Sequence, residues 1–299
     1  MNRVEAMSLF VRVAELQSFT AAALSLGLPK SSASQAVSQL EAHLKVQLLY
    51  RTTRRVQLTH DGQAYYERCR EVLAELDELD SMFSQTSELT GALRVDMPVS
   101  LARNFLVPRL PEFLGKHPGL DIELSCTDRR VDVVAEGFDC VVRVGALSDS
   151  ALMSRPLGLM RMGNYASPAY LTRHGEPKTL DDLTHHHLIH YALHLGARPF
   201  GFEYRDGDEY KVVDMPGRIT VNNTEAFSSA ALAGLGILQS PRTGNRHHVA
   251  EGRLVEILPQ YEAEPLPMSL IYPRRRHQAR RVRAFMDWVA EIITRDYLD

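Results

Sequence analysis

The sequence has few cysteines and no long apolar run. Three cysteines in 299 residues, Cys69, Cys126 and Cys140, are too few and too odd in number for a disulfide framework. Cys126 and Cys140 lie in apolar, strand-like surroundings, where inert packing is expected rather than a redox role. No run of about 18 apolar residues predicts a transmembrane helix, and residues 1–5 do not open a signal-peptide core. These absences predict a cytoplasmic protein without a membrane partner.

Catalytic signatures are also missing. The chain has no Gly-x-Ser-x-Gly element, no zinc-protease motif and no phosphate-binding loop. Several histidines between 185 and 194 stand at i, i+4 spacing, but no nearby acid or cysteine completes a convincing metal set. We therefore expect no enzyme, no metal and no cofactor.

Charge is distributed unevenly along the chain. The length suggests about two domains, and 44% hydrophobic residues are ordinary for a globular protein. The formal net charge is -3, yet residues 1–60 hold seven Lys and Arg against three acids. Residues 61–90 hold two bases against eight acids. A basic head predicts an anionic partner for the head alone, with chance clustering as the alternative.

Three helices are expected in the first 45 residues. Ser18 and Thr20 can accept hydrogen bonds at the start of the second helix, Gly27 suits its end, and Pro29 suits the start of the third. The first and third helices carry apolar residues at helical spacing: Met7, Phe10, Val11 and Ala14, then Ala33, Val37, Leu40 and Leu44.

The other face of the third helix is polar without being strongly charged. Serines are mediocre helix formers, so helix propensity does not explain them. Short hydroxyls and amides let a helix enter the major groove, where Gln reads an adenine edge. A helix, a short turn and a second helix with a polar face form a helix-turn-helix arrangement. The alternative is that the polar face of the third helix is only solvated. The residues expected at DNA are Lys30, Ser31, Ser32, Ser34, Gln35, Ser38 and Gln39, with Ser18 and Thr20.

A β-hairpin, or wing, is expected after the third helix. Leu49, Val56 and Leu58 supply its buried anchors, and the pair at 52 and 53 can form its tip. Guanidinium groups suit bidentate phosphate contacts. The wing residues expected at the DNA backbone are Arg51, Thr52, Arg54 and Arg55.

These motifs resemble those of LysR-type transcriptional regulators. The pattern is Ser18-Phe19-Thr20-Ala21-Ala22-Ala23, then Ser34-x-x-Val37-x-x-Leu40-Glu41, then Leu48-Leu49-Tyr50-Arg51-x-x-Arg54-Arg55-Val56-x-Leu58-Thr59-x-x-Gly62. The resemblance implies a ligand-responsive regulator that binds promoter DNA as a dimer or a dimer of dimers. The sequence departs from the family's pattern at two positions. Lys45 replaces the usual Gly, so a positive φ there would cost about 1 kcal/mol, and Pro29 replaces a common Ser or Thr.

A long helix is expected after Thr59, which can cap it. Its apolar residues are spaced by 4, 3, 4, 3 and 4, which is the heptad pattern of helices packed along a seam. The family resemblance implies a dimer along this helix, and the alternative is a seam against the chain's own C-terminal domain. Cys69 lies in this series as a packing residue, and the polar stretch 84–91 predicts a hinge near Gly91. The dimerisation residues are Tyr65, Val72, Leu76, Leu79 and Phe83.

The remainder predicts an α/β body. Strand-like runs at 93–97, 122–124, 140–144, 218–221 and 270–272 alternate with helical spacing at 101–114, 131–135, 226–235 and 282–293. Such alternation indicates parallel strands. A hairpin is expected over 202–212, turning at Asp206-Gly207. The resemblance implies a two-lobed effector domain related in fold to periplasmic binding proteins. The expected domains are 1–59 (winged helix-turn-helix), 60–90 (linker helix and hinge) and 91–299 (effector domain).

A ligand cleft is expected between the two lobes. Ligands of open α/β sheets bind beyond the carboxyl ends of strands. Ser100 and Thr224 each stand at the start of a helix after a strand, where free N–H groups favour an anion such as a small carboxylate metabolite. The alternative is that both hydroxyls are only helix caps. The full candidate set is Pro98, Val99, Ser100, Thr127, Arg143, Gly145, Asn223 and Thr224.

The expected partners are double-stranded DNA, a small-molecule effector and further copies of the chain, in a homodimer and a homotetramer. RNA polymerase is a candidate partner. Two other classes compete with this interpretation: a metabolite-binding protein or enzyme whose head only dimerises, and a constitutive DNA-binding protein. Binding to a defined duplex would argue against the first, and metabolite-dependent binding against the second. Effector identity and target genes are not legible from the residues.

Replacing one wing arginine provides a test of the backbone contact. Because Arg54 is expected at a phosphate, Arg54→Ala should weaken binding to all duplexes alike and reduce the salt slope of log K by about 1. Fluorescence anisotropy across a salt series measures this slope. An unchanged slope would remove Arg54 from the phosphate contacts.

Overall fold

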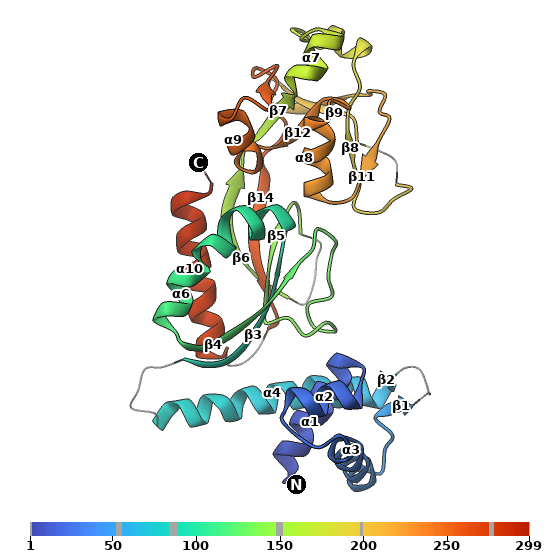
Figure 1. The fold of residues 1–299 in the computed structure, drawn as a ribbon, viewed down its shortest axis with the longest axis vertical. Helices are drawn as coiled ribbons and strands as arrows, with labels where there is room; N and C mark the ends of the chain where they lie inside the picture. Colours follow the sequence, from blue (N-terminus) through green and yellow to red (C-terminus); the bar gives the residue numbers. More distant parts are fainter. Residues whose placement is uncertain are drawn as a thin grey trace. The chain divides into compact units, whose positions relative to one another are not determined.

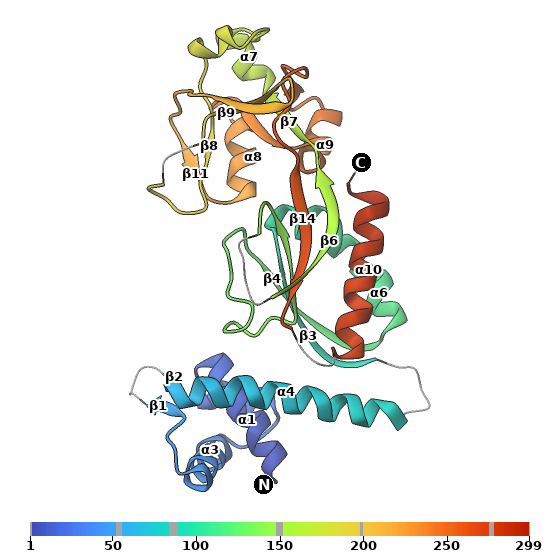
Figure 2. The same ribbon diagram turned by 180° about the vertical axis from the view of Figure 1, so that it is seen from behind.

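Residues 2–51, 56–83, 89–147, 152–197, 200–274 and 278–298 are described by a computed structural model of the chain (Figures 1 and 2). Most of the chain up to residue 87 belongs to one compact unit, and most of the chain from residue 88 onward belongs to another. The first unit is a small helical head with a long helix, and the second is an α/β body.

The head consists of α1 (Arg3–Leu16), α2 (Phe19–Ser25) and α3 (Lys30–Leu44) around one apolar core. Leu9, Phe10 and Val13 of α1 are fully buried in it. Small residues such as Ala22 and Ala33 allow α2 and α3 to approach α1 closely. The predicted apolar faces of α1 and α3 are confirmed. Met7, Ala14 and Leu44 of these faces are partly buried and pack against the core.

The end of α3 is tied to the wing. Lys45 adopts the predicted left-handed conformation, with φ of 57°. The Glu41 carboxylate accepts hydrogen bonds from the N–H groups of Leu48 and Leu49 at 2.9 and 3.1 Å. These bonds lead the chain into β1 (Leu49–Arg51), which pairs antiparallel with β2 (Val56–Leu58). Leu49 is fully buried, whereas Val56 and Leu58 are partly buried.

The long helix α4 (His60–Phe83) starts against this hairpin. Thr59 caps it as predicted: its Oγ1 accepts from the Gly62 N–H at 2.8 Å and donates to the Gln47 carbonyl at 2.7 Å. Gly62 lies so close to the hairpin that an added Cβ would stand 1.9 Å from the Leu48 carbonyl oxygen. The first turn of α4 is therefore fixed to the head by backbone proximity.

The first lobe of the body is a five-stranded sheet in the order β4-β3-β5-β14-β6. Strand β3, between β4 and β5, runs parallel to both, as predicted. The prediction of parallel strands is wrong for β14, which is antiparallel to both β5 and β6. The strands are β3 (Thr90–Met97), β4 (Gly119–Cys126), β5 (Cys140–Val144), β6 (Met153–Met160) and β14 (Leu266–Tyr272).

The path between the lobes explains the mixed sheet. The chain leaves the first lobe through β6 and enters β7 (Met162–Ala166) of the second lobe. It returns through β14, so the outgoing and returning strands lie side by side and run in opposite directions (Figure 1). A chain that crosses twice between lobes therefore places antiparallel strands at the crossing.

Helices cover one face of this sheet. The segment after β3 runs through α5 (Val99–Leu101), a π-helical turn η1 (Ala102–Leu106), a 3-10 turn η2 (Val107–Arg109) and α6 (Leu110–Lys116). Pro108 and Pro111, which lack an N–H, lie where the predicted single helix changes its hydrogen-bond pattern. Phe113 of α6 meets Phe285 of α10 (Arg280–Asp296) edge-on at 5.5 Å. Figures 1 and 2 both show α6 beside α10.

The second lobe surrounds β7. Strands β12 (Leu238–Pro241) and β13 (Val255–Glu256) flank β7, and β8 (His190–Tyr191) pairs parallel with β11 (Thr220–Val221). The hairpin β9 (Phe202–Asp206) and β10 (Glu209–Val213) completes the strands. The helices are α7 (Pro168–His174), η3 (Asp181–His185), α8 (Thr224–Leu232) and α9 (Arg242–Ala250), of which η3 and α9 were not predicted.

Three local predictions are wrong. Residues 131–135 form no helix: a turn closes there, with the Phe138 N–H bonded to the Val133 carbonyl. The hairpin turns one residue later than expected, at Gly207-Asp208. Gly91 is no hinge, because it lies in β3 opposite Leu120 with φ of 98°, and Thr90 before it is also paired in the sheet. Residues 84–88 of the expected hinge lie outside the described residues.

Gly62→Ala should destabilise the head, because the new methyl group would overlap the Leu48 carbonyl. Overpacking of this kind costs about 1–3 kcal/mol. Urea denaturation followed by circular dichroism of the full chain measures the loss. Gly115→Ala in α6 is the matched control, since nothing lies within 4 Å of its Cβ position. Equal stabilities for the two variants would contradict the close approach.

Candidate DNA-binding surface and effector pocket

The helix-turn-helix is built from α2 and α3. Ser18 begins α2 as its N-cap, with its hydroxyl accepting from the Ala21 N–H at 3.2 Å. Thr20 is exposed on the first turn of α2. Pro29 precedes α3 and offers no side-chain cap, as its chemistry requires.

The polar face of α3 is a surface of the head. Ser31, Ser34, Gln35, Ser38 and Gln39 are exposed, and Ser32 is partly buried, while the alanines and leucines of the opposite face form the core. The predicted residues therefore share one exposed helix face. The side chains of Lys30 and Arg51, and all of Thr52, Arg54 and Arg55, lie outside the part of the chain that the structure describes.

The predicted seam of α4 is divided between two roles. Tyr65 packs against Phe10 of α1 with ring centroids 5.6 Å apart, and Cys69 is fully buried in the head core. Burial raises the pKa of the Cys69 thiol to about 11. Tyr65 thus packs on the head of its own chain, and its part in dimerisation stays a prediction. Val72 and Leu76 are partly buried, and the side chains of Leu79 and Phe83 are outside the described set.

A pocket of about 710 Å³ lies between the two lobes of the body. Five of the eight predicted residues line it: Pro98, Ser100, Thr127, Arg143 and Thr224. Val99, Gly145 and Asn223 do not line it. Asn223 instead caps α8, with its Oδ1 accepting from the Ala226 N–H at 2.8 Å. The N–H of Gly145, which follows β5, donates to the carbonyl of Pro267 in β14.

Arg143 is held by a buried carboxylate. Its Nη2 lies 2.6 Å from Oδ2 of Asp96, whose side chain is 0% exposed, and the Thr127 hydroxyl donates to the same carboxylate at 3.1 Å. The guanidinium therefore neutralises an internal charge as well as lining the pocket. Thr127 is oriented by the same carboxylate.

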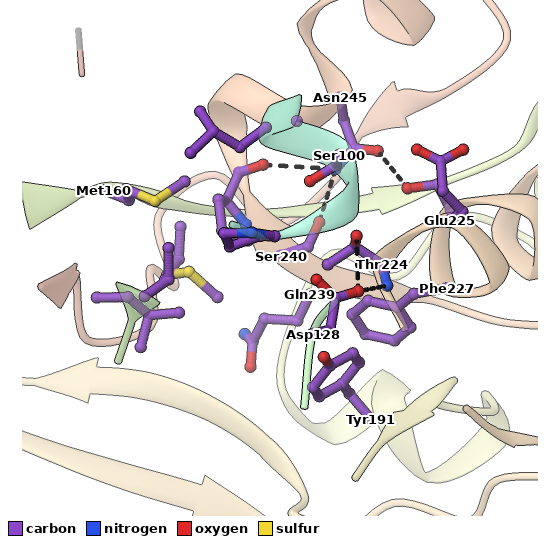
Figure 3. Close-up of a pocket in the computed structure, with 18 of the residues that line it drawn as sticks. Ser100, Asp128, Met160, Tyr191, Thr224, Glu225, Phe227, Gln239, Ser240 and Asn245 are labelled. Atoms are coloured by element: carbon purple, nitrogen blue, oxygen red, sulfur yellow. Dashed lines mark hydrogen bonds between the residues drawn. The ribbon is translucent and has the colours of Figure 1, made fainter. Parts of the chain in front are cut away.

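The first N–H of each of the two helix starts is bonded to an internal carboxylate, and the prediction of an anionic ligand stays a prediction. Asp128 Oδ1 accepts from the Val99 N–H at 3.1 Å, and Oδ2 accepts from the Thr224 N–H at 2.6 Å and the Thr224 hydroxyl at 3.0 Å (Figure 3). An internal carboxylate already occupies the position proposed for the ligand's carboxylate. Asp128 was missed because no local pattern marks it, and its partner Thr224 lies 96 residues away.

Other pocket residues divide into an aromatic pair, an apolar wall and polar side chains. Tyr191 and Phe227 lie with ring centroids 5.3 Å apart, and Met160, Met162, Leu266 and Met268 supply apolar surface. Burial, and then the Asp128 carboxylate, raise the pKa of Tyr191, which keeps its hydroxyl protonated. Burial also raises the pKa of Glu203, whose Oε2 accepts from the Glu264 N–H at 3.1 Å. Figure 3 shows Tyr191 and Phe227 beneath Asp128.

The histidines and cysteines form no metal site among the described residues. His186 is buried, with its Nδ1 3.1 Å from the Tyr170 hydroxyl, and burial lowers its pKa. Cys140 is buried as expected, whereas Cys126, the last residue of β4, is exposed, so the packing expected for Cys126 is wrong. Burial, followed by Asp96 and Asp128, raises the pKa of Cys126 and so suppresses its thiolate.

Two family models match this chain. Residues 4–63 match the bacterial regulatory helix-turn-helix protein, lysR family, and residues 86–293 match the LysR substrate binding domain. The chain belongs to the LysR-type transcriptional regulators. LysR-type regulators are ligand-responsive DNA-binding proteins, so the predicted family, the fold class and the function of a ligand-responsive transcriptional regulator are confirmed.

Relatives of this LysR-type regulator match along nearly the whole chain. The uncharacterized HTH-type transcriptional regulator YhjC of Escherichia coli is 49% identical, covering 100% of both chains. The HTH-type transcriptional activator AaeR of Escherichia coli is 35% identical over 92% of this chain and 89% of its own. Both names describe regulators of transcription rather than enzymes.

Solved full-length structures share the fold. CrgA, a LysR-type transcriptional regulator from Neisseria meningitidis, matches with a TM-score of 0.61 and 28% identity, covering 97% of this chain and 99% of its own. AphB, the virulence activator of Vibrio cholerae, matches with a TM-score of 0.59 and 26% identity over 97% and 99%. Among the described residues, no helix is both long and apolar enough to cross a membrane.

Arg143→Met should destabilise the body by about 3–5 kcal/mol, because it leaves the Asp96 carboxylate buried without a cation. Urea denaturation of the full chain measures the change. The double variant Asp96→Asn with Arg143→Met should lose less, since no buried charge remains. A single variant as stable as the wild type would show that the ion pair contributes nothing.

Proposed function

We propose that this LysR-type regulator reads a promoter half-site through the exposed polar face of α3. The observation that carries the proposal is the grouping of Gln35 and Gln39 with four serines on one helix face, opposite the buried face. Amides and hydroxyls of this length reach base edges in the major groove. We propose that Ser18 and Thr20 contact the DNA backbone, and that the wing residues Arg51, Thr52, Arg54 and Arg55 contact phosphates.

We propose that two heads act together along α4. Val72 and Leu76, only partly covered within the chain, continue the heptad spacing beyond Cys69. A dimer places two recognition helices on two half-sites, which fits a pseudo-palindromic operator. Pairing of dimers into tetramers and contact with RNA polymerase belong to the same proposal, and cytoplasmic location follows from the DNA partner. The chain would catalyse no reaction.

The inter-lobe pocket is the proposed effector site. Its volume of about 710 Å³ suits a small metabolite, and both lobes contribute side chains to it. A ligand alters transcription only if it favours one arrangement of the assembly over another. Pro98, Ser100, Thr127, Arg143 and Thr224 remain in the proposed site, with Val99 contributing through its N–H to Asp128.

Gln35→Ala tests the base-reading role. Removing the amide should cost about 1–3 kcal/mol on the specific operator and relax the preference at one base position. Operators selected from genomic fragments, with random duplex alongside, provide the binding measurement. Gln63→Ala on α4, whose amide bonds Glu67 at 2.9 Å, is the control. Equal weakening on specific and random DNA would rule out base reading by Gln35.

A further inference from the structure

Asp128 spans the two lobes of the body. It follows β4 of the first lobe, yet its Oδ2 binds the N–H and hydroxyl of Thr224, the first residue of α8 in the second lobe. Its Oδ1 binds the Val99 N–H where the helical segment of the first lobe begins. One carboxylate thus satisfies three donors that converge from two helix starts.

This arrangement changes which ligand charge the pocket accepts. A carboxylate of the chain itself occupies these donors in the structure, so a ligand carboxylate would have to displace it. A second anion placed beside it would instead meet a like charge in a partly desolvated space. The first N–H of each helix start is therefore already bonded to a carboxylate of the chain.

The three arginines that line the pocket each form an ion pair. Arg143 pairs with Asp96, Arg103 with Glu225, and Arg253 with Glu251. In contrast, Glu203 lines the pocket and forms no ion pair with any described residue. Asp128 and Glu203 are therefore the lining acids that form no ion pair with any described residue.

An aromatic pair stands beside the internal carboxylate. The rings of Tyr191 and Phe227 lie 5.3 Å apart, centroid to centroid, and both residues line the pocket with Asp128 (Figure 3). Aromatic faces attract cations, and the attraction grows when the cation is removed from water. A carboxylate next to two rings is the environment that suits a protonated amine.

We propose that Asp128 is a built-in anion that makes the pocket a receptor for a ligand carrying a protonated amine on an apolar body. The amine would face Asp128, Tyr191 and Phe227, and the apolar body would lie against Met160 and Met268. This inference rests on the proposed effector role of the pocket. It goes further by naming the chemical class of the effector and its specificity-determining residue.

Matched probes separate the two charges. 2-Phenylethylamine and phenylacetate share a phenyl group and a short chain but carry opposite charges, and n-hexylamine replaces the ring by an alkyl chain. Isothermal titration calorimetry with the full-length chain should detect binding of an amine. Phenylacetate should bind with an affinity that is lower by about tenfold or more. Asp128→Asn should lower the affinity for the amine by about tenfold or more, because the carboxylate charge is lost. Asp121→Asn, an exposed acid on β4, should leave both affinities unchanged.

Asp128→Ala tests the internal anion directly. The variant frees the donors of Val99 and Thr224, so added formate should fill the vacated position and raise the melting temperature of Asp128→Ala. The same formate should not raise that of the wild type or of Asp121→Ala. This readout needs no knowledge of the effector, and a destabilised variant is the case in which rescue is easiest to detect.

Two results would overturn the proposal. One is tighter binding of phenylacetate than of either amine by the wild type, or no binding of either amine. The other is the absence of any formate effect specific to Asp128→Ala. Operator binding by the same variants is measured in parallel. Loss of operator binding in Gln35→Ala, or retention of operator binding in Asp128→Asn, reports on the proposed function of the head. A wrong ligand class is therefore distinguishable from a failure of DNA recognition.

Discussion

The Asp128 carboxylate is the interaction on which the arrangement of the effector pocket depends. It binds the first N–H of the helical segment after β3 and the first N–H of α8, so it links the pocket-facing ends of both lobes. Charge-assisted hydrogen bonds of this kind are short and strong compared with neutral ones. Ser100, Thr224 and the aromatic pair then take their positions around a carboxylate rather than around an empty anion site.

The two crossings of the chain constrain the lobes at the opposite side of the same pocket. Glu262, on the returning segment, accepts from Arg161 at 2.8 Å on the outgoing segment and from Arg242 of α9 at 2.9 Å. Arg242 also donates to the Met162 carbonyl at the start of β7. A change in the angle between the lobes would act on these segments, on the bonds of Asp128 and on the Arg103–Glu225 ion pair. A ligand acts on the regulator by stabilising one such arrangement relative to another.

The head carries its own core, so the DNA-reading surface does not depend on side chains of the body for its shape. Tyr65 and Cys69 of α4 belong to that core, which fixes the direction in which α4 leaves the head. The Thr59 cap and the approach of Gly62 to Leu48 fix the same helix start from the other side. A dimer formed along the rest of α4 would therefore set the spacing of two recognition helices through rigid connections.

The sequence by itself determined the local elements: the apolar faces of α1 and α3, the exposed serines and glutamines, the caps at Ser18 and Thr59, and the left-handed Lys45. These follow from helical spacing and from the chemistry of single residues, which act over a few positions. Only the tertiary structure decided that Tyr65 serves the head core, that β14 runs antiparallel, and that Asp128 occupies the donors of Thr224. The physical reason is distance along the chain: hydrogen-bond donors at a helix start are identifiable from local sequence, but the group that satisfies them is brought in by the fold from 96 residues away.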